Sequence, residues 1–251
     1  MTTDQKKDSV LSIRGLKKSF GKNNVLNGFN MDLYRGESLA ILGRSGSGKS
    51  VLIKCIIGLI RPEAGEIIVM GKNVLTLNSN ELDELRIHVG FLFQSNALYD
   101  SLTVRDNLEF PLRRHWSQKS KMEIDQLVTE SLKAVGLAHT VEMMPAELSG
   151  GMRKRIALAR TLILKPDIIL YDEPTTGLDP VTGREISHLM TEVQEHYNTS
   201  SIIISHDMNC IKKTANRIIL LLDGVAYTTG TYAEFKKSDD PRVKDFFNSN
   251  A

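Results

Sequence analysis

The sequence predicts an α/β fold: a mostly parallel β-sheet core with an antiparallel β flap and an inserted helical segment. Three observations predict it. Short runs such as residues 39–42 and 168–171 are apolar throughout rather than alternating, which is typical of strands buried on both faces of a parallel sheet. From about residue 101 to residue 164 the pattern is helical only. A glycine-rich stretch at residues 43–48 joins one strand to the helix that follows it.

The remaining elements follow in chain order. Residues 11–20 and 25–33 alternate more between apolar and polar side chains and flank a turn at residues 21–24, so we expect them to form the flap. Asp179 as N-cap and Pro180 at the first helical position predict a helix that extends to about residue 197. The expected strands are residues 10–13, 39–42, 67–70, 89–93, 168–171, 202–204 and 218–222. The expected helices of the inserted segment are residues 103–114, 121–135 and 152–164.

These elements predict one domain over residues 1–251. We expect residues 1–94 and 165–251 to form the core with its flap, and residues 95–164 to form a helical subdomain. The net charge of +2 does not indicate a nucleic-acid partner. Residues 1–9 are polar and lack an apolar signal region, and no apolar run approaches the ~20 residues of a membrane span.

The two cysteines, Cys55 and Cys210, are isolated from each other and from any histidine cluster. Cys55 lies among aliphatic residues, so we predict a core position for it. Together with the charge and the polar start of the chain, this indicates a reduced, soluble, cytosolic protein.

The most informative motif is Gly43-Arg44-Ser45-Gly46-Ser47-Gly48-Lys49-Ser50, between a predicted strand and a predicted helix. Its glycines allow the backbone N–H groups to converge on an anion, and the helix adds its positive end. In this pattern Lys49 reaches the β- and γ-phosphates of a nucleotide, and the Ser50 hydroxyl binds Mg²⁺. The alternative, a surface turn rich in glycine and serine, leaves the strand and helix on either side unexplained.

Asp172 and Glu173 come directly after the aliphatic run 168–171. Ligands of open α/β sheets bind at the carboxyl ends of the strands, so we expect both carboxylates beside the glycine-rich loop. Asp172 is suited to hold Mg²⁺, directly or through water. Glu173 is suited to act as a general base on a water molecule, a role worth about 10²–10⁴ in rate.

A third motif, Ser149-Gly150-Gly151-Met152, begins a predicted helix. A serine hydroxyl and two small residues at a helix start make a second anion site, although alone the pattern is equally a simple N-cap. In this order the three motifs resemble those of the ATP-binding-cassette (ABC) transporters, specifically their nucleotide-binding subunit, over about residues 11–223. The resemblance implies a P-loop NTPase fold, ATP and Mg²⁺ as cofactors, and ATP hydrolysis coupled to transport. It also implies a homodimer in which the third motif closes on the ATP of the second copy.

The resemblance assigns roles to four further residues. Phe20 corresponds to the aromatic residue that stacks on adenine, although a phenylalanine in a flap strand is otherwise a core residue. Gln94 corresponds to the glutamine that joins the Mg²⁺ site to the membrane partner. His206 corresponds to the switch histidine at the γ-phosphate, and Asp179 to the aspartate that communicates across the dimer. Two positions depart from the family pattern: Val51 replaces a common threonine and Met152 a glutamine.

Several stretches resemble one subgroup, the ATPase of Mla-type transporters, which move phospholipid together with Mce-domain proteins. These stretches are residues 93–99, 107–112, 148–155 and 239–247. The resemblance implies a separate integral membrane permease as partner, an Mce-domain protein in the same complex, and a peripheral position at the cytoplasmic face of the inner membrane. We interpret the basic run Arg153-Lys154-Arg155 as a solvated helix face rather than a lipid contact.

Three alternatives remain beside this interpretation. The ATPase of another ABC transporter class would share every motif. A cytosolic cassette ATPase of translation or DNA repair would carry a second cassette or long insertions, which this chain lacks. A regulatory cassette that does not hydrolyse ATP would lack Glu173 or His206, and both are present.

Overall fold

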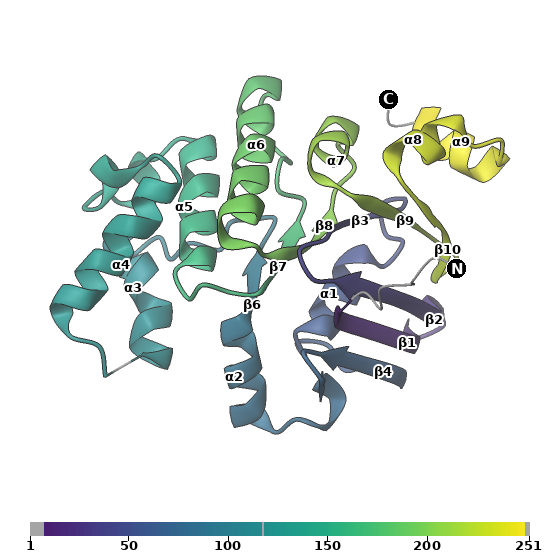
Figure 1. Cartoon of the computed structure of the whole chain (residues 1–251), viewed down its shortest axis with the longest axis horizontal. Coiled ribbons are helices and arrows are strands. Elements are labelled where there is room, and N and C mark those ends of the chain that lie inside the picture. Colours follow the sequence, from purple (N-terminus) through teal and green to yellow (C-terminus); the bar gives the residue numbers. More distant parts are fainter. Residues whose placement is uncertain (1–7, 117, 249–251) are drawn as a thin grey trace, which may run out of the picture.

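The computed structural model describes residues 8–116 and 118–248, and its elements form two sheets with helices packed around them (Figure 1). Residues 1–7, most of the polar stretch for which the sequence predicts no signal region, lie outside the described residues. Within the described ranges, no helix has both the length and the apolar character needed to cross a membrane.

The larger sheet has six strands in the order β10-β9-β3-β8-β7-β6. They are β3 (Ser38–Leu42), β6 (Val89–Leu92), β7 (Ile168–Asp172), β8 (Ser200–Ile204), β9 (Arg217–Leu222) and β10 (Val225–Gly230). All neighbours pair in parallel except β10, which is antiparallel to β9. β3, β7 and β8 are buried at every residue. The predicted mostly parallel core is therefore confirmed.

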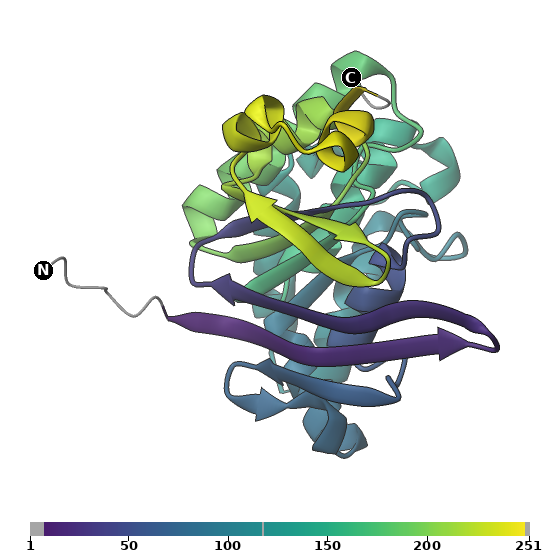
Figure 2. The same ribbon diagram turned by 90° about the vertical axis from the view of Figure 1, so that its right-hand side faces the viewer.

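The smaller sheet is the predicted antiparallel flap, in the order β2-β1-β4-β5. Its strands are β1 (Ser9–Phe20), β2 (Asn23–Tyr34), β4 (Ala64–Val69) and β5 (Lys72–Asn73). The apolar run predicted at residues 67–70 belongs to this sheet, and Met70 lies just beyond the strand. In Figure 2 the long strands of the flap cross below the β9–β10 hairpin, and the Asn27 N–H donates to Gly224 O of that hairpin (2.8 Å).

Alternate residues of the larger sheet face two different layers. Leu39 and Ile41 of β3 pack in one cluster with the flap and with α1 (Lys49–Ile56), which also buries Cys55 as predicted. Ala40 and Leu42 face the other side, where the C-terminal helices cover them. Besides α1, the α-helices outside the inserted segment are α2 (Ser79–His88), α6 (Pro180–Tyr197), α7 (Met208–Thr214), α8 (Tyr232–Lys237) and α9 (Pro241–Asn248). The sheet is thus buried on both faces, as its aliphatic strands require.

The inserted segment between β6 and β7 contains α3 (Val104–His115), α4 (Lys121–Ala134) and α5 (Gly150–Leu162). All three were predicted, but α5 begins at Gly150 rather than at residue 152, because Ser149 Oγ accepts a hydrogen bond from the Met152 N–H (3.2 Å) and so caps the helix.

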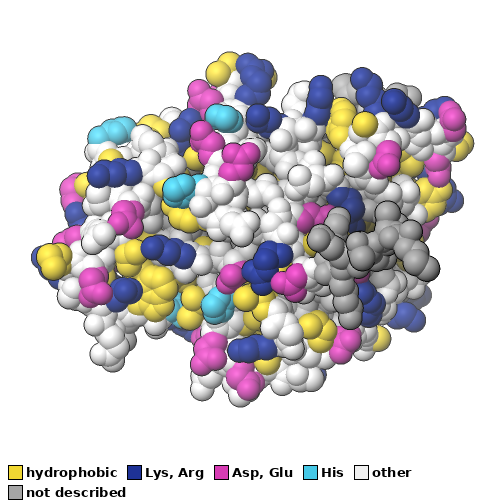
Figure 3. Space-filling view, viewed as in Figure 1, with side chains coloured by type: hydrophobic (Ala, Val, Ile, Leu, Met, Phe, Trp, Pro, Cys, Tyr) yellow, Lys and Arg dark blue, Asp and Glu magenta, His cyan; other side chains and the backbone are white. Residues whose placement is uncertain are grey.

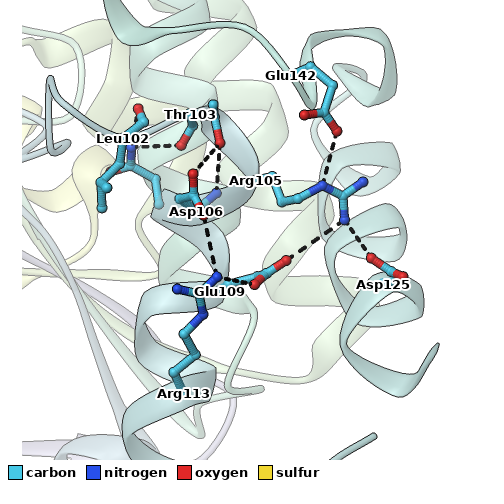
Figure 4. Close-up of polar contacts among 9 residues, drawn as sticks. Leu102, Thr103, Arg105, Asp106, Glu109, Arg113, Asp125 and Glu142 are labelled. Atoms are coloured by element: carbon cyan, nitrogen blue, oxygen red, sulfur yellow. Dashed lines mark hydrogen bonds and ion pairs between the residues drawn. The ribbon is translucent and has the colours of Figure 1, made fainter. Parts of the chain in front are cut away.

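An ion-pair network holds the inserted segment together (Figure 4). Arg105 of α3 pairs with Asp125 of α4 and, at 3.0 Å, with Glu142 in the loop before α5. Its Nη1 also lies 3.8 Å from Glu109, one turn along α3. The Arg105 N–H donates to Val141 O (2.9 Å), so the backbone of the same loop is tied to α3. The network therefore joins α3, α4 and the loop that leads to the Ser149 motif.

We predict that Arg105→Gln lowers the free energy of unfolding by about 1 kcal/mol, because a networked and partly buried arginine contributes at the upper end of the range for ion pairs near the surface. Urea denaturation measures this change. The control is Arg35→Gln, which removes a pair with Asp8 whose two side chains are both well exposed. Equal stability losses for the two variants would contradict the role of the network.

Candidate active site

The glycine-rich loop joins β3 to α1, as predicted, and encloses its own lysine. Lys49 Nζ donates to Gly43 O (2.8 Å) and Arg44 O (3.0 Å), so the ammonium points into the loop. Burial lowers the pKa of Lys49, an effect that the nearby Glu173 and Asp172 carboxylates oppose. A loop of this kind at a helix N-terminus is suited to hold a phosphate group beside the lysine.

Two glycines of the loop differ in how closely they are packed. Gly48 has φ 102°, and a Cβ there would lie 2.5 Å from Val25 Cγ1 of the flap. Gly46 also has a positive φ, 76°, but a Cβ there would meet nothing within 4 Å. The loop therefore presses against the flap at Gly48 and is open at Gly46.

The predicted Mg²⁺ ligands Ser50 and Asp172 lie together, with Ser50 Oγ donating to Asp172 Oδ1 at 3.1 Å. Asp172 is almost fully buried, and this burial raises the pKa of its carboxyl group, although the hydrogen bond from Ser50 opposes the shift. A hydroxyl and a buried carboxylate are the hard oxygen donors that Mg²⁺ takes alongside phosphate oxygens and water, so the two residues fit the ion.

Gln94, the third predicted ligand, follows β6, next to β7 in the sheet. Leu92 pairs with Tyr171, so Gln94 and Glu173 each lie two residues beyond that pair at the ends of neighbouring strands. The Gln94 side chain is exposed, whereas its main-chain oxygen accepts a hydrogen bond from Lys154. The structure thus places Gln94 at the same edge of the sheet as Glu173.

Glu173 and His206 form the predicted pair at the ends of β7 and β8. Glu173 Oε2 lies 2.8 Å from His206 Nδ1 and accepts a second hydrogen bond from Thr176 Oγ1 at 3.1 Å. Glu173 has φ 51°, a left-handed conformation that is strained for this residue type and that clusters at functional sites. The side chain of Glu173 is largely buried and that of His206 is exposed. This arrangement suits a carboxylate that orients a water molecule and a histidine that faces the ligand.

Phe20 lies at the end of β1 with half of its surface exposed, which excludes the alternative of a core residue. A flat, exposed ring at this position is suited to stacking on a base. Val51, one of the two departures from the family pattern, packs partly buried against the core cluster of the flap and α1.

The Ser149 motif and Asp179 lie beside each other but apart from the phosphate loop. Asp179 caps α6 by accepting from the Val181 and Thr182 N–H groups, at 3.0 and 3.1 Å. A Cβ on Gly151 would lie 2.5 Å from Thr182 Cγ2, so the start of α5 packs closely on the start of α6. Within the described residues, no hydrogen bond or ion pair connects the four motif residues to the loop at residues 43–50.

Lys154 corrects the interpretation of residues 153–155 as a solvated face. Only 2% of Lys154 is exposed, and its Nζ donates to Gln94 O at 2.9 Å. Burial lowers the pKa of Lys154 to about 8. The signal that could have revealed it is helical spacing: Lys154 shares a face of α5 with the buried Ala157 and Leu158, at i+3 and i+4.

An apolar groove of about 480 Å³ opens between α3 and the end of β6. Tyr99 and Phe110, whose rings are 4.9 Å apart, are exposed at its rim. Arg160 and the rings of Phe91 and Phe93 also line it. Figure 3 shows the hydrophobic side chains gathered over α3.

Comparison with known families matches residues 26–176 to the family described as ABC transporter. The chain is 39% identical to a probable ribonucleotide transport ATP-binding protein, mkl, of Mycobacterium leprae, over 95% of this chain and 69% of that protein. It is 37% identical to the intermembrane phospholipid transport system ATP-binding protein MlaF of Haemophilus influenzae, over 95% of this chain and 90% of that protein. The chain spans about two thirds of the length of the mycobacterial relatives that it matches.

Among solved structures, the fold is similar to a dimeric ATP-binding cassette in a post-hydrolysis state bound to ADP and Pi. The TM-score is 0.80 at 32% identity, over 88% of this chain and 98% of the other.

We predict that Gly48→Ala weakens nucleotide binding by tenfold or more, because a methyl group would collide with Val25 and force the loop to move. Gly46→Ala is the control: it also forces an alanine to a positive φ, at a cost of about 1–2 kcal/mol, but without the collision. Equilibrium binding of a fluorescent ATP analogue compares the two. Equal affinities would show that the contact between the loop and the flap does not shape the site.

Proposed function

Because this chain belongs to the ABC transporter family as an ATP-binding subunit, we propose that it hydrolyses ATP to power a separate permease in a phospholipid transport system of the Mla/Mce type. The observation that carries the hydrolytic part is the pairing of Glu173 with His206 beside Lys49 and Asp172. The phospholipid part is supported by the similarity to MlaF, which extends over 90% of that protein.

Each residue of the site has its own role in phosphoryl transfer to water. Phe20 stacks on the adenine, and the loop at residues 43–51 with Lys49 holds the phosphates. Ser50, Asp172 and Gln94 would hold Mg²⁺, which would supply positive charge to neutralise the phosphates. Glu173 and His206 orient the attacking water. In this reaction catalysis consists mainly of positioning and of charge stabilisation.

Two copies of the chain close around two ATP molecules. Each copy presents Ser149, Gly150, Gly151 and Met152 to the γ-phosphate held by the other, and Asp179 lies at the same contact. The exposed start of α5 and the dimeric state of the similar cassette support this arrangement. Met152 contributes by holding Ser149 in place, because its N–H donates to Ser149 Oγ (3.2 Å) at the helix N-terminus.

The permease docks in the apolar groove beside Gln94, and an Mce-domain protein completes the complex. Residues 95–164 form a helical subdomain beside the core formed by residues 1–94 and 165–251. The chain is held at the cytoplasmic face of the inner membrane by this contact. A ribonucleotide as cargo is the second candidate, favoured by the similarity to the mycobacterial protein named as a probable ribonucleotide transport ATP-binding protein.

We predict that Glu173→Gln binds ATP, accumulates as a closed dimer and turns over at least about 10² more slowly, because the amide cannot accept a proton from water. Size-exclusion chromatography with ATP and a phosphate-release assay measure the two effects. Glu192→Gln, a change at an exposed side chain on α6, serves as control and retains turnover. Unchanged hydrolysis in Glu173→Gln would exclude the assigned base.

The complex itself tests the transport assignment. We expect this chain, isolated with its partners in mild detergent, to carry a permease, an Mce-domain protein and phospholipid, all identified by mass spectrometry. A permease that arrives with nucleotide-binding partners and no lipid would favour the ribonucleotide alternative. Ribosomal or DNA-repair proteins without any permease would overturn the transport function.

A further inference from the structure

α5 directs two cationic side chains, the buried Lys154 and the half-buried Arg160, at one short loop. Lys154 Nζ donates to Gln94 O (2.9 Å), and Arg160 donates to Asn96 O (2.9 Å) and Ala97 O (2.7 Å). The loop at residues 94–97 therefore has three of its four main-chain oxygens bound by side chains of a single helix.

The backbone of this loop is strained. Asn96 has φ 65° and Ala97 has φ 51°, both in the left-handed region, which is unfavourable for alanine. Such conformations persist only where surrounding contacts over-determine them. Here those contacts are the hydrogen bonds from α5, so the position of the helix dictates the path of the loop.

Lys154 is a costly residue for this position. Its ammonium is almost completely removed from water, and the Gln94 oxygen is the hydrogen-bond partner that it has in the structure. An apolar side chain would fit the buried face of α5 without the loss of hydration. What the lysine adds is a fixed distance between α5 and the backbone of Gln94, together with a positive charge that acts on the Asp172 and Glu173 carboxylates.

We infer that Lys154 is a positioning residue that holds Gln94 at the metal edge of the sheet and ties it to the Ser149 end of α5. This inference rests on the proposed function, in which Gln94 acts on the chain's own ATP and Ser149 on the ATP of the partner. Lys154 lies five residues after Ser149, about 7.5 Å along a rigid helix. Lys154 thus connects the two ATP sites of the dimer through one side chain.

The first test measures Mn²⁺, a spectroscopic substitute for Mg²⁺, bound to the full chain with ATP in the Glu173→Gln background. Lys154→Met is expected to weaken Mn²⁺ binding, followed by electron paramagnetic resonance, by about tenfold, as loss of a group that orients a metal ligand does. ATP binding without a divalent metal should stay within twofold. Arg155→Met is the matched control on the same helix, since Arg155 contacts Val135 O and Glu185 and not this loop.

A double-mutant cycle with Gln94→Ala separates positioning from general stability. Gln94→Ala removes the metal-binding side chain but keeps the main-chain oxygen that Lys154 holds. If Lys154 acts through Gln94, adding Lys154→Met to Gln94→Ala causes no further loss of Mn²⁺ affinity. Additive losses would overturn the inference, as would an equal loss in Arg155→Met.

Lys154→Gln replaces Lys154→Met if the latter melts below the assay temperature, and a smaller loss is expected because the amide still donates. Lys154→Arg, which keeps the cation, should recover part of the affinity. Failure of the parent Glu173→Gln protein to bind ATP and Mn²⁺ would count against the proposed function. Normal binding in the parent, together with unchanged affinity in the Lys154 variants, would overturn only the role of Lys154.

Discussion

The parallel pairing of β7 with β8, and of β8 with β3, is the constraint on which the site depends. Because parallel strands end at the same edge, Ser50, Asp172, Glu173 and His206 meet there although they lie far apart in the sequence. Their hydrogen bonds, from Ser50 to Asp172 and between Glu173 and His206, only refine positions that the sheet register has already fixed. A one-residue slip of β7 would turn Asp172, the one of these residues that lies within a strand, to the opposite face.

Burial gives this edge its chemical character. Asp172 and Lys49 are both largely removed from water. Burial raises the pKa of the Asp172 carboxyl group and lowers the pKa of the Lys49 ammonium group, so it favours the neutral form of each. Two groups of opposite charge in a poorly solvated site offset each other only in part, so each still gains from a ligand of complementary charge. A nucleoside triphosphate supplies negative charge for Lys49, and a divalent cation bound with it supplies positive charge for Asp172. The charges of the site are therefore complementary to those of the proposed ligand.

How much the sequence could predict depends on how local each signal is. The aliphatic run of β7 and the glycine-rich loop are recognisable from consecutive residues alone, so the phosphate loop and the parallel strands of the core sheet were predicted, as was the flap. The antiparallel edge strand β10 was not, because each of its residues is at least partly exposed. The polar helix α2 was not, because it buries only Leu85 and is held by a cap between Asn78 and Glu81. Lys154 was misinterpreted because it lies between Arg153 and Arg155, so the three basic residues were treated as one solvated face although helical spacing puts Lys154 on the buried face. The left-handed backbone of Glu173 arises from tertiary contacts and has no signature in the sequence.

The pairing of β3 also determines when the phosphate loop can exist during synthesis. β3 ends at Leu42, yet both of its neighbours in the sheet, β8 and β9, belong to the last quarter of the chain, and the last of their paired residues is Leu220. Contacts so distant in sequence form late, after the entropy of closing a long loop has been overcome. A nascent chain on the ribosome therefore carries the complete glycine-rich sequence long before it can bind nucleotide, and the apolar strand beside it must stay shielded from aggregation until β9 emerges.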